Sequence, residues 1–129
     1  MSYYLAKTIE AESIDAARER VAAALADEGF GVLAETDLQA TLQDKLGVDF
    51  RPYRILGACN PKLALGALQA EDKIGTMLPC NVISQMTSEG QFEVAAVDPV
   101  ASMAAVENAV LGETAAKVSA KLRAVIGAL

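Results

Sequence analysis

The stretch Arg51–Asn81, RPYRILGACNPKLALGALQAEDKIGTMLPCN, decides the fold, because it sets a strand, a helix and a second turn one after another. Residues 53–58 form a short, mostly apolar run that is typical of a buried strand. Asn60-Pro61 then predicts the start of a helix, since Asn is a preferred N-cap and Pro suits the first helical position. Residues 78–81, Leu-Pro-Cys-Asn, form a second turn that leads into another apolar run.

The two cysteines of the chain lie at these two turns. Cys59 precedes a predicted helix N-terminus, where the helix dipole favours a thiolate. If the strands that end and begin at the two turns are antiparallel neighbours, Cys59 and Cys80 approach each other. If the helix between them makes a parallel crossover, they lie about 20 Å apart. The residue pattern leaves both arrangements open, and a buried cysteine is often only a small apolar side chain.

Length and composition indicate how many domains the chain has and which kinds of partner and compartment suit it. The chain has 129 residues, which predicts a single domain over residues 1–129. Its apolar content is 53%, built on Ala, Leu and Val with few aromatics, and dimerisation would bury more of this surface. The net charge of −6 disfavours nucleic-acid binding, and we find neither an apolar run long enough to span a membrane nor a signal-peptide layout. We expect a cytosolic protein with reduced thiols.

The chain contains no histidine. This absence removes the most common general base, the imidazole metal ligand and the usual pH switch. Ser-His-Asp and Cys-His catalysis is excluded, as is a Cys2His2 zinc site. The sequence therefore favours a protein that is not an enzyme.

The order of elements predicts an α+β fold. Periodicity and turn residues give strand, helix, strand, helix, strand, helix, strand, strand, helix. We expect a mainly antiparallel, curved sheet of about five strands with helices packed on one face. The alternative is a mixed α/β sheet with a parallel crossover at residues 59–80.

Local signals predict several boundaries: Ser13 is a good N-cap for the first helix and Gly29 ends it, and Gly90 is available for a positive φ in a hairpin that joins strands 81–86 and 91–97. Thr36 and Gln39 match a capping box for a short second helix. The Ala- and Val-rich residues 100–110 suggest an irregular helical turn, and the last helix is expected over residues 114–129.

The chain resembles the domain of unknown function 302 family over nearly its whole length. The resemblance rests on the run GFGVLAETDLQATLQDKLGVDFRPYRILGACNPKLA and on LPCNV and AAVDPVA further on, and its most specific parts are Asn60-Pro61 and Leu78-Pro79. It implies a small α+β domain with a curved antiparallel sheet, often a homodimer, and no established activity. It also implies that the two cysteine turns come together. Many members lack cysteine at positions 59 and 80, so this sequence is identified as a member of a cysteine-containing subset.

The first functional hypothesis is a module that binds a small molecule or anion. Basic residues and a helix N-terminus occur together in a segment that lacks acids between positions 50 and 68, and free backbone N–H groups at such a terminus suit an anion. The opposing interpretation is that the arginines pair with Asp49, Glu71 or Asp72. The predicted ligand-binding residues are Arg51, Arg54, Cys59, Asn60, Lys62, Pro79, Cys80 and Asn81.

The second hypothesis is thiol chemistry. Cys59 and Cys80 are the predicted metal ligands, for a soft ion such as Cu(I) or Zn(II), or the partners of a reversible disulfide. Met77 and Met86 are the candidate thioether ligands, although methionine more often fills a core. We expect no other cofactor.

The third hypothesis is catalysis by carboxylates, for which only Asp98 and Glu93 merit inspection. Both are better explained as turn-forming or solvated residues. The glycines are scattered singly and form neither a phosphate-binding nor a dinucleotide-binding motif.

Overall fold

The computed structural model describes residues 2–129 and has an open five-stranded sheet in the order β1-β5-β4-β3-β2, with every neighbouring pair antiparallel. The α+β prediction is therefore confirmed, and the parallel crossover at residues 59–80 is excluded. The strands are β1 (Tyr4–Glu10), β2 (Gly31–Asp37), β3 (Tyr53–Cys59), β4 (Cys80–Ser88) and β5 (Gln91–Val97).

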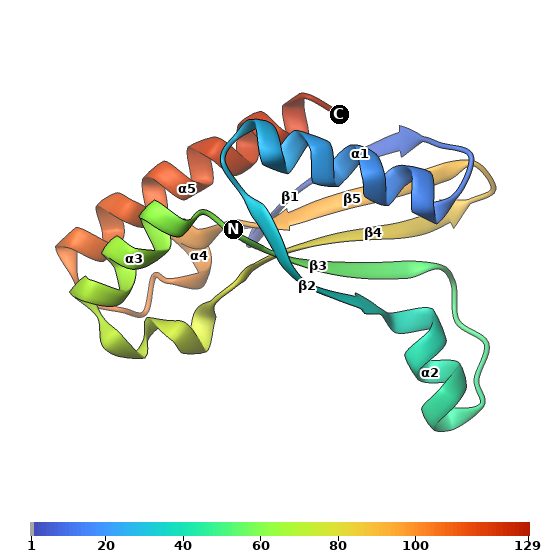
Figure 1. Ribbon diagram of the computed structural model, residues 1–129, viewed down its shortest axis with the longest axis horizontal. Coiled ribbons are helices and arrows are strands. Elements are labelled where there is room, and N and C mark those ends of the chain that lie inside the picture. Colours follow the sequence, from blue (N-terminus) through green and yellow to red (C-terminus); the bar gives the residue numbers. More distant parts are fainter. Residues whose placement is uncertain (1) are drawn as a thin grey trace.

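Two long helices, α1 and α5, lie across one face of the sheet (Figure 1). The remaining helices connect the strands or extend beyond the sheet. The helical elements are α1 (Ile14–Asp27), α2 (Leu38–Leu46), α3 (Pro61–Ala70), the 3-10 helix η1 (Asp72–Met77), α4 (Pro99–Ser102) and α5 (Ala109–Gly127). Within residues 2–129, no helix is both long and apolar enough to cross a bilayer.

The main core lies between the sheet and the two long helices. Alternate residues of the central strands, such as Val82 and Val94, point toward the helices and are fully buried. They meet the apolar stripes of α1 and α5, represented by Val21 and Leu122. A smaller second cluster is formed by buried residues of α3, η1 and the start of α5, with Ile74 of η1 among them. The site described below lies between these two clusters.

Two turns follow the sequence signals and one does not. Ser13 caps α1 by accepting a hydrogen bond from the Ala16 N–H at 3.0 Å. Gly29 follows α1 with φ of 85°, a conformation that glycine adopts without strain. The predicted Thr36 cap of α2 is wrong, because β2 continues to Asp37 and its carboxylate accepts from Ala40 N–H at 3.0 Å. The Gln39 side chain instead donates to the Phe50 carbonyl at 2.9 Å.

The last helix is longer than the expected span of residues 114–129, since α5 begins at Ala109. Its cap is Asn108, whose oxygen accepts from Leu111 N–H at 3.2 Å while its amide donates to the Ala70 carbonyl at 2.9 Å. The tertiary bond to the end of α3 thus fixes where α5 starts. The short helix α4 occupies part of the segment expected to be irregular.

Candidate functional site

The antiparallel pairing of β3 with β4 brings the two cysteine turns together. Ala58 lies directly opposite Cys80, so that Cys59 is one residue further along the neighbouring strand. The connection formed by α3 and η1 leaves the end of β3 and returns to the start of β4, so both turns lie at the same end of these two strands. The two turns separated by about twenty residues of sequence therefore form one corner of the molecule.

Local chemistry fixes both turns. Asn60 caps α3 by accepting from Leu63 N–H at 3.4 Å, and Pro61 occupies the first helical turn, as predicted. The Leu78-Pro79 peptide bond is cis. The ring of Pro79 lies over Gly57, where an added Cβ would be only 2.6 Å from Pro79 Cγ. Glycine is therefore required at position 57 for Pro79 to approach β3 this closely.

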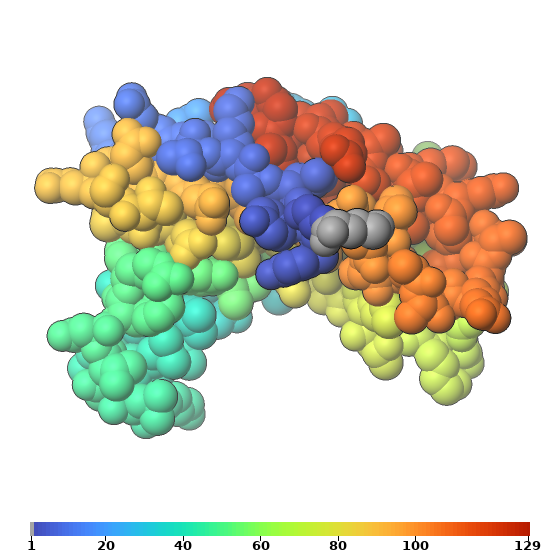
Figure 2. All heavy atoms as spheres, turned by 180° about the vertical axis from the view of Figure 1, so that it is seen from behind, coloured from blue at the N-terminus to red at the C-terminus, as the bar shows by residue number. Residues whose placement is uncertain are grey.

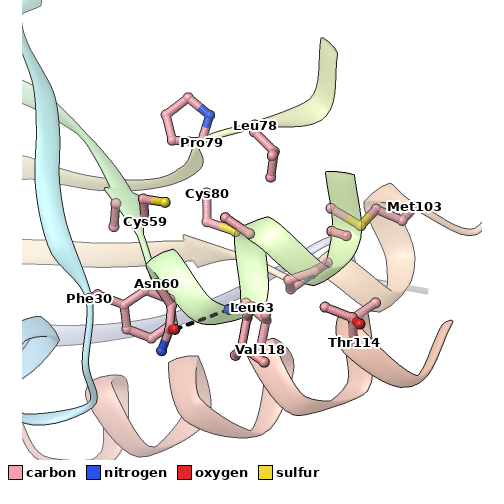
Figure 3. Close-up of a pocket in the computed structure, with 15 residues that line it drawn as sticks. Phe30, Cys59, Asn60, Leu63, Leu78, Pro79, Cys80, Met103, Thr114 and Val118 are labelled. Atoms are coloured by element: carbon pink, nitrogen blue, oxygen red, sulfur yellow. Dashed lines mark hydrogen bonds between the residues drawn. The ribbon is translucent and has the colours of Figure 1, made fainter. Parts of the chain in front are cut away.

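A small apolar cavity of about 30 Å³ opens at this corner (Figure 3). Side chains from β3, α3, β4, α4 and α5 line it, and they are almost entirely apolar. Apart from the thiols, the polar side chains in its lining are Asn60 and Thr114. Both are already used, since Asn60 caps α3 and the Thr114 hydroxyl donates to the Val110 carbonyl at 3.2 Å. The cavity thus offers little to a polar ligand.

Three sulfur-bearing side chains line the cavity: Cys59, Cys80 and Met103. Cys80 is buried, with 7% of its surface exposed, and Cys59 is half-buried; neither forms a disulfide. Burial, and to a smaller extent the charge of neighbouring Cys59, together raise the pKa of the Cys80 thiol to about 11.

The methionine at the cavity differs from the two that the sequence nominated. Met77 lies on η1 and is exposed, while Met86 packs against the main core on β4. Met103 directly follows the short helix α4, and its backbone N–H caps that helix on the Pro99 carbonyl. No periodic signal in residues 100–110 indicates where this side chain points, so sequence reasoning had no means of selecting it.

Arg54 lies at the opposite end of β3 from Cys59. Its guanidinium pairs with Asp15 at 2.8 Å, Glu35 at 3.2 Å and Asp37 at 3.5 Å. The carboxylates that pair with Arg54 are therefore not Asp49, Glu71 or Asp72, the partners suggested by their proximity in the sequence. At the rise of a strand, Arg54 and Cys59 are about 17 Å apart along β3.

Arg51 lies near the same end as Arg54. Its guanidinium carbon is 4.5 Å from the centre of the Phe50 ring and 5.6 Å from that of Tyr53, and its Nε donates to Gln85 at 2.8 Å. Stacking and hydrogen bonding therefore hold this side chain on the surface of β3 and β4. The structure does not bring either arginine to the cysteine corner.

The other predicted ligand-binding residues divide between two surfaces. Pro79 lies at the cavity, while Asn81 alternates to the opposite face of the sheet. Lys62 is exposed on the first turn of α3 and borders a shallow depression that also carries Asp27 and Glu28. Asp27 and Glu28 balance the charges of Lys62 and Lys121 in this depression, so it carries no net positive charge for an anion.

The two carboxylates chosen for inspection have structural partners. Asp98 caps α4 by accepting from Val100 N–H at 3.1 Å and pairs with Arg123 at 3.6 Å. Glu93 accepts from the Gln85 amide at 2.9 Å on the uncovered face of the sheet. Across residues 2–129 there is no group of three or more His, Cys, Asp or Glu side chains placed to hold a metal ion.

Comparisons with known proteins agree with this fold. The sequence matches the family described as "Domain of unknown function DUF302" over residues 5–129. Among solved structures, the chain is similar to an uncharacterized conserved protein DUF302 from Bacillus stearothermophilus, with 27% identity, a TM-score of 0.89 and 98% of each chain covered. No curated protein matches the chain.

Proposed function

The chain belongs to the DUF302 family, whose description names no activity, and we propose that it binds a soft metal ion, Cu(I), through the thiols of Cys59 and Cys80. One observation carries the proposal: Cys59 and Cys80 both line a single cavity whose other polar side chains, Asn60 and Thr114, each already make one hydrogen bond. Sulfur is the soft donor atom that the side chains of this cavity offer to a bound species.

The size of the cavity supports an ion rather than a metabolite. Its volume of about 30 Å³ is close to that of one water molecule, while pockets for small organic ligands are typically about 300–1,000 Å³. Thiolate and thioether sulfurs favour Cu(I) among the biological metals. Met103 supplies a neutral thioether in the same lining and is the candidate for a third ligand.

Binding replaces protons with the metal. Two neutral thiols and one Cu(I) give a bis-thiolate complex of net charge −1 and release two protons. The raised pKa of Cys80 means that an isolated thiolate is unfavourable in this apolar setting. A bound cation offsets that penalty, because it neutralises the charge where it forms. Affinity is therefore expected to rise with pH as proton release becomes easier.

A reversible disulfide between the two cysteines is less well supported. Thiol–disulfide exchange requires a thiolate, and a cysteine with a pKa of about 11 is almost entirely protonated at neutral pH. The strand register also places Cys80 opposite Ala58 rather than opposite Cys59. The two observations argue against Cys80 as the attacking thiolate and against direct cross-strand pairing of the two cysteines.

The hypothesis that the chain binds an organic anion, which the sequence suggested, has less support from the positions of its basic residues in the structure. Arg54 is surrounded by three carboxylates, and Arg51 is stacked on aromatic rings about 20 Å or more from the cysteine corner along the strand. Of the basic residues in the hypothesis, Lys62 alone lies near the α3 terminus, beside two acids. The separated charges do not form a common anion site.

The test is an anaerobic titration of reduced protein with Cu(I) in competition with a chromogenic Cu(I) chelator. Wild-type protein is expected to take up one Cu(I) per chain. Cys59→Ser and Cys80→Ser should each lower the affinity by about 100-fold or more, since losing a charged ligand should cost at least as much as losing its outer-shell partner. The proposal fails if wild-type protein takes up no copper, or if neither substitution changes the affinity.

A methionine pair provides the matched control. Met103→Leu removes the thioether that lines the cavity and should lower the Cu(I) affinity by about 10-fold. Met77→Leu makes the same chemical change at an exposed position on η1 and should leave the affinity unchanged. Equal effects of the two substitutions would show that Met103 is not a ligand.

A further inference from the structure

A second cavity, of about 360 Å³, lies on the face of the sheet that α1 and α5 leave uncovered. Residues of β3, β4 and β5 line it together with the start of the chain around Tyr4. Figure 2 shows that the molecule is hollowed on this side of the sheet, between the projecting α2 and the region of η1. Sites for small organic molecules are typically about 300–1,000 Å³ in volume. This cavity therefore has room for a ligand that the cavity at the cysteine corner is too small to hold.

All three tyrosines of the chain, Tyr3, Tyr4 and Tyr53, line this cavity, which we call the tyrosine cavity. The chain has three tyrosines, three phenylalanines and no tryptophan, so half of its aromatic rings lie in one lining. The rings of Tyr3 and Tyr4 pack edge to face with their centres 5.1 Å apart. Tyr3 is nevertheless 69% exposed and Tyr4 is 45% exposed, so much of each ring is accessible to a ligand. Open ring faces of this kind bind a further ring or a cation.

Glu93 is the one charged side chain in the lining of the tyrosine cavity. It is half-buried on β5, and its Oε1 accepts a hydrogen bond from the Gln85 amide at 2.9 Å. The oxygen of that amide accepts from Arg51 Nε at 2.8 Å, so the orientation of Gln85 is fixed from both sides. Within residues 2–129, Glu93 forms no ion pair and its Oε2 has no hydrogen-bond partner. A positioned carboxylate oxygen is therefore available to a donor on a ligand.

The charges around the tyrosine cavity favour a cation over an anion. Glu10 faces the same side of the sheet, where the Gln91 amide donates to it at 3.2 Å, and it adds a second negative charge. Arg51 contacts the lining residues Gln85 and Tyr53 but is not part of the lining. The chain as a whole carries a net charge of −6, which attracts a positively charged ligand.

The strand register separates the carboxylate from the tyrosine pair. Tyr4 lies opposite Val97, which is four residues from Glu93 along β5, or about 14 Å at the rise of a strand. Ala95 lies between them and faces Ile83 of β4, so the stretch from Glu93 to Tyr4 has an apolar floor with one small side chain. This spacing suits a ligand whose charged group and ring are joined by a short apolar linker.

We propose that the tyrosine cavity binds a small aromatic amine, with its protonated nitrogen at Glu93 and its ring on Tyr3 and Tyr4. The nitrogen donates a charge-assisted hydrogen bond to Glu93 Oε2. The linker lies over Ala95 and Ile83, and the ring makes aromatic contacts with the tyrosine pair. The tyrosine cavity shares no lining residue with the cavity at the cysteine corner, so this binding does not depend on Cu(I).

A titration with 2-phenylethylamine, followed by the amide chemical shifts of the protein in NMR spectra, tests this inference. We expect a Kd of about 0.1–1 mM, in the range for so small a ligand, and the largest shifts in β4 and β5 around Ile83 and Ala95. The alcohol 2-phenylethanol keeps the ring without the charge, and butylamine keeps the charge without the ring. Each should bind at least about 10-fold more weakly. Absence of shifts in β4 and β5, or equal binding of the three compounds, overturns the inference.

A pair of glutamate variants locates the charge. Glu93→Gln removes the charge but keeps an oxygen for the bond from Gln85, and it should raise the Kd of 2-phenylethylamine by about 10-fold. Glu89→Gln makes the same change at an exposed residue in the turn between β4 and β5, and should leave the Kd unchanged. Equal Kd values for wild type and Glu93→Gln would overturn the assignment even if the amine binds.

A tyrosine variant locates the ring. Tyr4→Leu keeps an apolar side chain but removes the ring, and it should raise the Kd of 2-phenylethylamine by about 3-fold to 5-fold. The Kd of butylamine, which has no ring to stack, should change less. An unchanged Kd of 2-phenylethylamine in Tyr4→Leu would contradict the placement of the ring on the tyrosine pair.

Discussion

The two ends of β3 carry the most distinctive side chains of the chain, and they differ in whether those side chains already have partners. At the start of the strand, Arg54 is paired with three carboxylates, and Arg51 is stacked and hydrogen-bonded. At its end, Cys59 faces a small cavity that it shares with Cys80. A charged side chain with satisfied partners stabilises the fold, whereas the sulfurs that line the cavity are the groups to which we assign metal binding.

Of the effects that test this comparison, we expect the largest at the cysteine end of β3, where the free energy of unfolding should depend on pH. The Cys80 thiol ionises near pH 9.0 in an unfolded chain but near 11 in the folded one. The neutral thiol therefore stabilises the fold below pH 9, and that contribution is lost as the pH rises toward 11. We expect wild type to lose about 2–3 kcal/mol more than Cys80→Ala over this range.

Urea denaturation of the two proteins at pH 8, 9, 10 and 11 measures the difference. Other groups titrate in the same range, and comparing wild type with Cys80→Ala cancels their contribution. Parallel pH profiles for the two proteins would mean that Cys80 is not shielded from water as the structure indicates.

At the other end of β3, removing the arginine should destabilise the fold by a somewhat smaller amount. Arg54→Met leaves three carboxylates close together without their cation, and the Arg54 side chain is only 18% exposed. We expect the free energy of unfolding to fall by about 2 kcal/mol, between the values typical of exposed and buried ion pairs.

Arg51→Met is the matched control for this prediction, because Arg51 has no carboxylate partner among the ion pairs of the described residues. Its loss should cost less than about 1 kcal/mol in urea denaturation. If the two substitutions destabilised the protein equally, the carboxylate cluster would not be the feature that sets Arg54 apart.

The smallest expected effect lies between the two ends, at Gly57. An alanine there would place its Cβ 2.6 Å from Pro79 Cγ, so Pro79 must move away from β3. Gly57→Ala should lower the free energy of unfolding by about 1–2 kcal/mol.

The control is Gly66→Ala, which introduces the same atoms in α3, where nothing lies within 4 Å. It should stabilise the protein by about 0.5–1 kcal/mol, because alanine is the better helix former. A Gly57→Ala protein as stable as wild type would show that the Pro79 turn adapts without strain.

The order of elements was largely predictable from local signals. Asn60-Pro61 marked the start of α3, Ser13 marked that of α1, and Gly90, in the turn between the hairpin strands β4 and β5, has a positive φ. These signals are local because capping and turn formation depend on residues within one or two turns of the chain. The start of α5 was missed because a bond from Asn108 to the distant Ala70 carbonyl helps to fix it.

The candidate site was only partly predictable. Placing Cys59 near Cys80 required the strand direction, which the residue pattern left open and the resemblance to a known family favoured. The prediction that the arginines and the cysteines share one site was wrong, because the five residues from Arg54 to Cys59 span about 17 Å of extended strand. The partners of Arg54, Asp15 and Glu35, come from other elements and are not visible in its neighbourhood of sequence.

The most direct test of the central claim is the copper content of reduced protein after exposure to Cu(I) and removal of excess metal by a competing chelator. Soft-metal binding at the cysteine corner predicts one copper per chain in wild type and almost none in the double variant Cys59→Ser/Cys80→Ser. Equal copper content in the two proteins, or none in either, would contradict it.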